Sequence, residues 1–82
     1  MSCSVYILYS RTVDRYYIGV SQDVQRRVHQ HNAGYAPATK GRGPWRLCRT
    51  EVYPTRAAAR RREAFLKRQK SRRYLEQLLA QL

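Results

Sequence analysis

An arginine and a histidine lie one helical turn apart in the segment VQRRVHQH, and side chains of these types can hold an anion and move a proton. The spacing i, i+3, i+4, i+7 places four side chains on one helix face: Val24, Arg27, Val28 and His31. The valines should bury this face, and an unpaired buried guanidinium is costly. We therefore expect Arg27 and His31 to be paired or to line a cavity. The alternative is that Arg27 extends to solvent and His31 is a hydrogen-bonded histidine at the helix end.

A single acid stands in a strongly basic run. Nine basic residues lie from Arg56 to Arg73, and Glu63 is the only acid among them. Glu63 precedes Lys67 by one helical turn, the favoured order for a helix-surface ion pair worth roughly 0.2 to 0.5 kcal/mol. The other interpretation is a carboxylate that holds a divalent metal, whose remaining oxygen ligands come from a phosphate and from water. The sequence leaves both open.

The charge balance favours a polyanionic partner. The chain has 82 residues, with 17 Lys and Arg against 5 Asp and Glu, and a net charge of +12. This length suits one domain with one modest core, and this charge attracts nucleic acid. A membrane surface would call for an amphipathic helix with large apolar residues opposite the cations. We find no such segment and expect a cytoplasmic protein. Cys3 and Cys48 are too few for a zinc site and are interpreted as ordinary thiols.

The candidate residues lie on or beside predicted strands and helices. Ser4–Tyr9 and Arg15–Val20 are rich in β-branched and aromatic residues, and they should pair antiparallel through the loop SRTVD. Side-chain alternation places Tyr6 on one face of the first strand, and Tyr17 and Gly19 together on one face of the second. The glycine leaves room there for a close approach.

Capping signals predict where the next elements begin and end. A helix capped by Ser21 or Asp23 should run to about Asn32, with Gly34 as its stop signal. A loop with glycines and prolines then leads to a strand over Trp45–Tyr53.

Two further helices should follow this strand. Pro54 and Thr55 open a helix that runs to about Lys70, and Ser71 caps a final one. An apolar stripe on the final helix comprises Tyr74, Leu75, Leu78, Leu79 and Leu82. The stripe packs either on its own domain or on a second subunit.

Five sequence elements occur in an order that resembles the GIY-YIG nuclease superfamily: SVY (4–6), YIG (17–19), RRVHQHN (26–32), ATKGRGPW (38–45) and REAFLK (62–67). The chain looks most like the small stand-alone, UPF0213-like members, which are close to the nuclease domain of the Slx1 structure-specific endonucleases. The resemblance covers nearly the whole chain. The second triplet matches in full, but the first keeps only its tyrosine, with Ser4 and Val5 in place of glycine and isoleucine. Val20 stands where some members have a lysine, so chemistry assigned to that lysine does not carry over.

The resemblance implies a fold and a catalytic set. The fold is α+β, a three-stranded antiparallel sheet flanked by helices in the order β-β-α-β-α-α, as a single domain over residues 1–82. Tyr6 matches the general base, or the group that orients the attacking water. Tyr17 matches a tyrosine near the scissile phosphate or metal-bound water, and Gly19 matches a strand glycine that allows close packing beneath the site. Arg27 matches an arginine that contacts the phosphate in the transition state. Glu63 matches the ligand of a single Mg²⁺ or Mn²⁺.

The chemistry of this set is coherent. Phosphodiester hydrolysis builds negative charge on the non-bridging oxygens, which Arg27 and a metal on Glu63 would stabilise. A tyrosine with a pKa of about 10 is a poor base. Tyr6 therefore needs cations that favour its phenolate, or a metal that acidifies the attacking water. His31, which matches a histidine found in several branches of the superfamily, has three open roles: it positions a tyrosine, contacts the leaving group or shuttles a proton.

Five cations are expected to contact the backbone of a nucleic acid: Lys40, Arg42, Arg60, Arg61 and Lys67. The first two lie in a glycine-containing loop, whose alternative role is that of a simple connection. No segment resembles a recognition helix or a zinc finger. Sequence specificity is therefore expected to be weak, or to be supplied by a protein partner.

These expectations converge on a metal-dependent endonuclease that hydrolyses DNA in repair or recombination. It would prefer branched, flapped or single-stranded features to a base sequence, with RNA left open as a substrate, and would act as a monomer or homodimer. The alternative is a nucleic-acid-binding accessory module that is non-catalytic or depends on a partner. In a third interpretation, Glu63 only pairs with Lys67.

Overall fold

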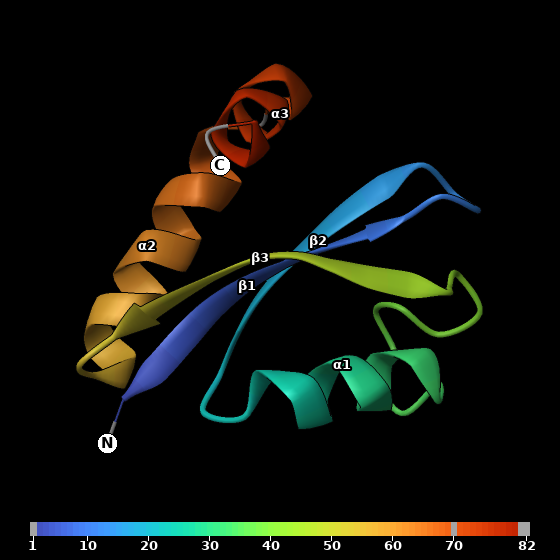
Figure 1. Cartoon of the computed structure of the whole chain (residues 1–82), viewed down its shortest axis with the longest axis horizontal. Helices are drawn as coiled ribbons and strands as arrows, with labels where there is room; N and C mark the ends of the chain where they lie inside the picture. The colour runs from blue at the N-terminus through green and yellow to red at the C-terminus, as the bar shows by residue number, and fades with distance from the viewer. Residues whose placement is uncertain (1, 70, 81–82) are drawn as a thin grey trace.

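The computed structural model describes residues 2–69 and 71–80 and forms a three-stranded antiparallel sheet with helices on both faces (Figure 1). The elements are β1 (Cys3–Ser10), β2 (Arg15–Ser21), α1 (Val24–Asn32), β3 (Trp45–Tyr53), α2 (Arg56–Gln69) and α3 (Arg72–Leu79). The strand order is β2-β1-β3, so β1 is central. The predicted α+β class and the element order are confirmed. The predicted end of the second helix, Lys70, lies outside the described residues.

Strand β1 separates two apolar clusters, because its side chains alternate between the faces of the sheet. Val5 and Ile7 pack with Ala59 and Leu66 of α2 on one face. On the opposite face, one cluster brings together Tyr6, Leu8 and Trp45 with the partly buried Val24 and Val28 of α1. The predicted apolar face of the first helix is therefore the face that it buries.

Gly19 allows Tyr6 to lie against the backbone of β2. The two residues are directly opposite each other in the antiparallel register. A Cβ atom at position 19 would collide with the hydroxyl and the ring of Tyr6. The room that this glycine was expected to leave is thus filled by a tyrosine of the same sheet.

Predicted capping residues are found at the ends of α1 and α2. Of the two candidates for α1, Asp23 is the N-cap, and its side chain accepts a hydrogen bond from the Arg26 amide at 3.1 Å. Gly34 follows the end of this helix with a φ of +85°, a conformation that favours glycine. The Thr55 hydroxyl accepts from the Ala58 amide at 3.1 Å at the start of α2.

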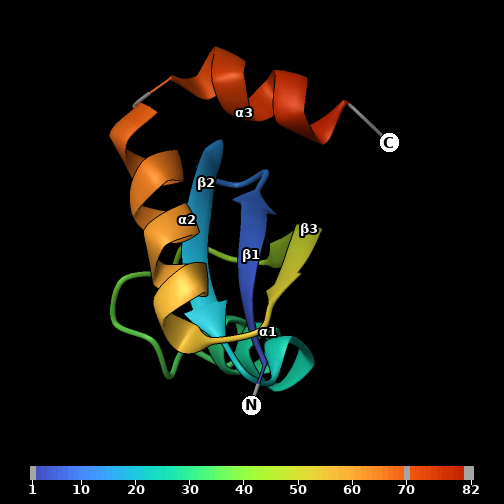
Figure 2. The ribbon, with the colours of Figure 1, turned by 90° about the vertical axis from the view of Figure 1, so that its left-hand side faces the viewer.

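The final helix packs on its own domain. Ser71 caps α3, and its stripe of Tyr74, Leu75, Leu78 and Leu79 packs against the cluster between the sheet and α2; Leu82 lies outside the described residues. Figure 2 shows α3 crossing the end of the sheet where β1 and β2 are connected. There, Arg72 binds the Asp14 carboxylate with nitrogen–oxygen distances of 2.5 and 3.0 Å. No helix in the described ranges is long and apolar enough to cross a membrane.

A half-buried carboxylate ties β3 to α2. Glu51 accepts hydrogen bonds from Arg49 at 2.7 Å, from Arg62 at 2.9 Å and from the Tyr53 hydroxyl at 2.9 Å. Its side chain is only 13% exposed. Burial alone would raise the pKa of Glu51, but the hydrogen bonds from Arg62, Arg49 and Tyr53 outweigh it and lower the pKa to about 2.

Replacing this carboxylate by Glu51→Gln should destabilise the fold in a pH-dependent way. A pKa lowered from 4.5 to about 2 stabilises the folded state above pH 4.5, and the contribution is lost as the pH falls toward 2. We expect the variant to lose about 2 kcal/mol of unfolding free energy at pH 7, because glutamine keeps part of the hydrogen bonding. Urea unfolding at pH 7 and pH 3 should show the gap to wild type narrowing at the lower pH.

The matched control is Glu76→Gln, which removes an exposed carboxylate paired with Arg72. It should cost less than about 0.5 kcal/mol at either pH. An equal loss in both variants would contradict the structural role of Glu51.

Candidate active site

Three buried side chains form a hydrogen-bonded chain between β1, α1 and the loop that follows α1. The Tyr6 hydroxyl lies 2.9 Å from His31 Nε2, and His31 Nδ1 lies 2.7 Å from Thr39 Oγ1. Their exposed fractions are 1%, 2% and 1%. His31 is thus buried and paired, and it is also a hydrogen-bonded histidine at the end of α1, so the geometry is compatible with both interpretations of this residue.

The hydrogen-bond network assigns the tautomer of His31. The Thr39 hydroxyl donates to the Ala36 carbonyl at 3.4 Å, which leaves its oxygen free to accept. Nδ1 therefore carries the proton and donates to Thr39, and Nε2 accepts from the Tyr6 hydroxyl. Burial lowers the pKa of His31, and the nearby Arg27 lowers it further, so the imidazole is neutral near pH 7.

Tyr6 is not an activated base within the protein alone. Burial raises the pKa of its phenol, Arg27 opposes that effect, and the charges of Tyr17 and Glu63 add to it. The net direction is upward, so the phenolate is disfavoured at neutral pH. Proton transfer from Tyr6 therefore requires an acceptor, and His31 Nε2 already faces the hydroxyl.

Arg27 is half-buried and paired with a neutral group. Its Nη1 donates to Gln30 Oε1 at 3.2 Å, and no carboxylate pairs with it among the described side chains. A guanidinium has five N–H donors, so Arg27 keeps donors that can bind an anion in a bidentate manner. Its neighbours Arg26 and His29 are exposed, as the helix periodicity predicts.

Tyr17 completes the aromatic part of the site. Its ring meets the His31 ring edge-on with centroids 4.8 Å apart, and it lies 6.4 Å from the Tyr6 ring and 6.4 Å from the Trp45 ring. The side chain is half-buried. The structure thus brings together four of the predicted residues: Tyr6, Tyr17, Arg27 and His31.

Glu63 lies on α2, and its charge is the smallest of the three influences that raise the pKa of Tyr6, after burial and Tyr17. The side chain is 24% exposed and lies 3.3 Å from Lys67, the ion pair that was one of the two interpretations of this residue. Lys67 is 55% exposed, and such a surface pair is weak, so a stronger cation can displace it.

The donor set suits a metal that takes few protein ligands. Within residues 2–69 and 71–80, no three His, Cys, Asp or Glu side chains are grouped to hold a metal. Mg²⁺ keeps several waters and is commonly held by one or two carboxylates together with substrate phosphate. Glu63 alone therefore fits such an ion, provided that a phosphate supplies further oxygens.

The five predicted backbone contacts differ in their relation to this site. Arg42 lines a cavity together with Tyr17, and Lys67 pairs with Glu63. All five side chains are exposed to solvent, including those of Lys40, Arg60 and Arg61. Gly19 lies opposite Tyr6 in the strand register, in close contact with its ring.

Two residues of the site were not singled out from the sequence. Thr39 was quoted only as part of a loop motif. Asn32 clamps the loop by accepting from the Trp45 amide at 2.6 Å and donating to its carbonyl at 3.0 Å. Trp45 in turn donates from Nε1 to the Thr39 carbonyl at 3.2 Å. Asn32 at the helix end and the polar Thr39 in a glycine-containing loop were the only local signals.

Comparisons with known proteins agree with this geometry. The GIY-YIG catalytic domain family model matches residues 2–75. A UPF0213 protein of Halalkalibacterium halodurans is 41% identical over 81 residues, which make up 98% of this chain and 84% of that protein. The structure-specific endonuclease subunit SLX1 homolog of Brugia malayi is 41% identical over 80 residues, which cover 84% of this chain but only 24% of that protein.

A solved structure is similar over nearly the full length. The solution NMR structure of the UPF0213 protein BH0048 from Bacillus halodurans has a TM-score of 0.61 and 41% identity, and covers 98% of this chain and 84% of that one. The resemblance in the sequence motifs is therefore confirmed at the level of the fold. The chain belongs to the GIY-YIG catalytic domain family, among its UPF0213 members.

Proposed function

We propose that the protein is a divalent-metal-dependent endonuclease that hydrolyses DNA phosphodiester bonds at branched, flapped or single-stranded features, in repair or recombination. The observation that carries the proposal is the hydrogen bond from Tyr6 to a neutral, buried His31 beside Arg27. The net charge of +12 supports a nucleic acid as the substrate. A protein partner would supply further specificity, since the relative from Brugia malayi is named a subunit.

Arg27 would bind the scissile phosphate. Its remaining N–H donors can hold two non-bridging oxygens, whose negative charge grows in the transition state. A metal held by Glu63 would add a second positive charge at the same phosphate. Binding of the phosphate would be favoured because the described carboxylates leave Arg27 without an ionic partner.

Tyr6 and His31 would move the proton of the attacking water. The water gives a proton to the Tyr6 oxygen while the tyrosine passes its own proton to His31 Nε2, so no free phenolate is needed. The water oxygen would bond to phosphorus as the bond to the leaving oxygen breaks, and the leaving oxygen would take up a proton from solvent. Thr39 acts as a positioning residue, because it holds the Nδ1 proton and keeps Nε2 free to accept.

The rival function is a binding module without independent cleavage. The Glu63–Lys67 ion pair favours it, because in this arrangement the only candidate metal ligand already has a partner. Under this alternative, the protein binds DNA but a partner performs or enables the cutting.

Cleavage of a panel of DNA structures distinguishes the two functions. Labelled duplex, single strand, 5′ flap, fork and four-way junction are incubated with Mg²⁺, Mn²⁺ or EDTA. Wild type should cut with either metal and not with EDTA. Arg27→Ala and Glu63→Ala should each lower the rate by about 100-fold or more.

The matched controls are Arg26→Ala, an exposed arginine beside Arg27, and Glu76→Ala, an exposed acid on α3. Both should cut at nearly the wild-type rate. Tight DNA binding without cutting, unchanged in Glu63→Ala, would instead support the binding module.

The pH dependence tests the neutral histidine. Since the folded pKa of His31 lies below 6.5, the cleavage rate should be lost on acidification with a midpoint below pH 6.5. The pH–rate profile should be measured under single-turnover conditions. A midpoint above 6.5 would contradict a neutral, buried acceptor.

Thr39→Val should disturb the tautomer without touching the substrate. The buried Nδ1–H loses its acceptor, at a cost of about 1 to 3 kcal/mol of stability. The tautomer equilibrium of His31 should therefore shift toward the form that carries the proton on Nε2. We expect the rate constant to fall about tenfold or more at constant KM. Nitrogen NMR of the histidines should report the change in tautomer, and Thr39→Ser should restore both readouts. An unchanged tautomer in Thr39→Val would refute the positioning role.

A further inference from the structure

Two cavities border the start of β2, the edge strand of the sheet that carries Tyr17. The first has a volume of about 640 Å³ and lies toward α2 and α3, with Ile18, Leu66 and Leu75 in its lining. The second has a volume of about 620 Å³ and is lined in part by Tyr17 and Trp45. Both cavities are therefore lined in part by apolar or aromatic side chains, and the second includes Tyr17 of the candidate active site.

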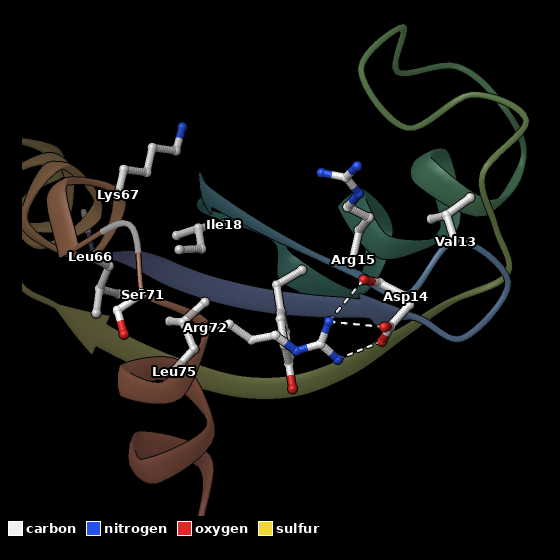
Figure 3. A pocket seen from close by; sticks show the side chains of 10 residues that line it. Val13, Asp14, Arg15, Ile18, Leu66, Lys67, Ser71, Arg72 and Leu75 are labelled. Atoms are coloured by element: carbon white, nitrogen blue, oxygen red, sulfur yellow. Dashed lines mark hydrogen bonds and ion pairs between the residues drawn. The ribbon is translucent and has the colours of Figure 1, made fainter.

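The rims of these cavities are positively charged. Figure 3 shows the Lys67 and Arg15 side chains of the first cavity projecting toward the same side, above Ile18, while Arg72 is paired with Asp14. Arg15 and Arg42 border the second cavity, and none of the described residues that line it is acidic. Arg15 and Arg42, which form no ion pair with a described carboxylate, can thus meet an anionic chain.

Three residues join the two cavities, because Val13, Arg15 and Tyr16 line both of them. Arg15 is the charged residue of the three. Tyr17 belongs to the second cavity, and Lys67, which pairs with Glu63, belongs to the first. The second cavity therefore adjoins the candidate active site through Tyr17, the first is linked to Glu63 through the ion pair of Lys67, and Arg15 lies where the two cavities meet.

We propose that the two cavities form one groove that binds the unpaired strand leading away from the scissile phosphate. Arg15 contacts a backbone phosphate at the middle of the groove, and unstacked bases lie on Tyr17 and on the apolar side chains around Ile18. The bases of a single strand have free faces that can stack on aromatic and apolar side chains. The bases of a duplex are already stacked on one another, so such a lining suits a single strand better. The location relative to the cut rests on the proposed function, whereas strand binding does not.

The test measures binding in EDTA, where no cleavage occurs. Labelled oligothymidylate and a duplex of equal length are titrated with wild type, Arg15→Ala and the matched control Arg11→Ala, an exposed arginine in the turn of the same hairpin that lines neither cavity. Arg15→Ala should weaken binding of the single strand about tenfold and lower the salt slope by about 0.7, the value for one lost phosphate contact on a single strand. Arg11→Ala should stay within about twofold of wild type.

The fluorescence of Trp45, the single tryptophan of the chain, provides a second readout inside the groove. Oligothymidylate should change its emission, and the duplex should not. Equal effects of the two arginine variants, or a duplex that binds with the same dependence on Arg15, would overturn the proposal.

A cleavage assay separates this proposal from the proposed function. On a flap substrate, Arg15→Ala should lose about tenfold in rate, while on a nicked duplex it should match Arg11→Ala. If the wild type cuts DNA but Arg15→Ala behaves like Arg11→Ala in every assay, the groove proposal is refuted and the nuclease proposal is not. If the wild type binds single strands through Arg15 but never cuts, the nuclease proposal is refuted and the groove proposal is not.

Discussion

The contact between Tyr6 and Gly19 controls the assembly of the whole site. Because position 19 has no side chain, the phenol lies against the backbone of β2 and its hydroxyl meets His31 from α1. One side chain therefore depends on the register of two strands and on the position of a helix. A register slip by one residue would place β-branched Ile18 or Val20 opposite Tyr6, and the contact would be lost.

The site buries polar groups without burying a charge. Each of the three groups in the chain from Tyr6 to Thr39 has a hydrogen-bond partner, and no buried side-chain polar atom among the described residues is unsatisfied. Burial lowers the pKa of His31 and favours the neutral imidazole, and Arg27 adds to this effect because a second cation beside the guanidinium would be repelled. The same repulsion leaves Arg27 as the single positive charge of this cluster, and this charge is available to an incoming phosphate.

The sequence predicted those features that depend on short spacings. Strand alternation separated Tyr6 from its neighbours, the helical period placed His31 on the buried face, and Ser71 was recognised as a cap. Side-chain pairs that are distant along the chain had no such signal. His31 and Thr39 are 8 positions apart, Asn32 and Trp45 are 13 apart, and Glu51 and Arg62 are 11 apart. Such pairs are determined by how the loop and α2 return to the sheet, and one sequence does not contain that information locally. The Glu63–Lys67 pair, one turn apart, was anticipated as an alternative and is present.

The ion pair between Asp14 and Arg72 joins residues 58 positions apart, and it connects the hairpin turn next to Arg15 to the last helix. During synthesis, the hairpin leaves the ribosome long before its partner does. A nascent chain can pair β1 with β2 and dock α1, but the wall that α3 contributes beside Arg15 is present only after synthesis has passed residues 72–79. The hydrogen bonds around Tyr6, His31 and Thr39 need the chain only as far as Trp45, so the two parts of this surface form at different times.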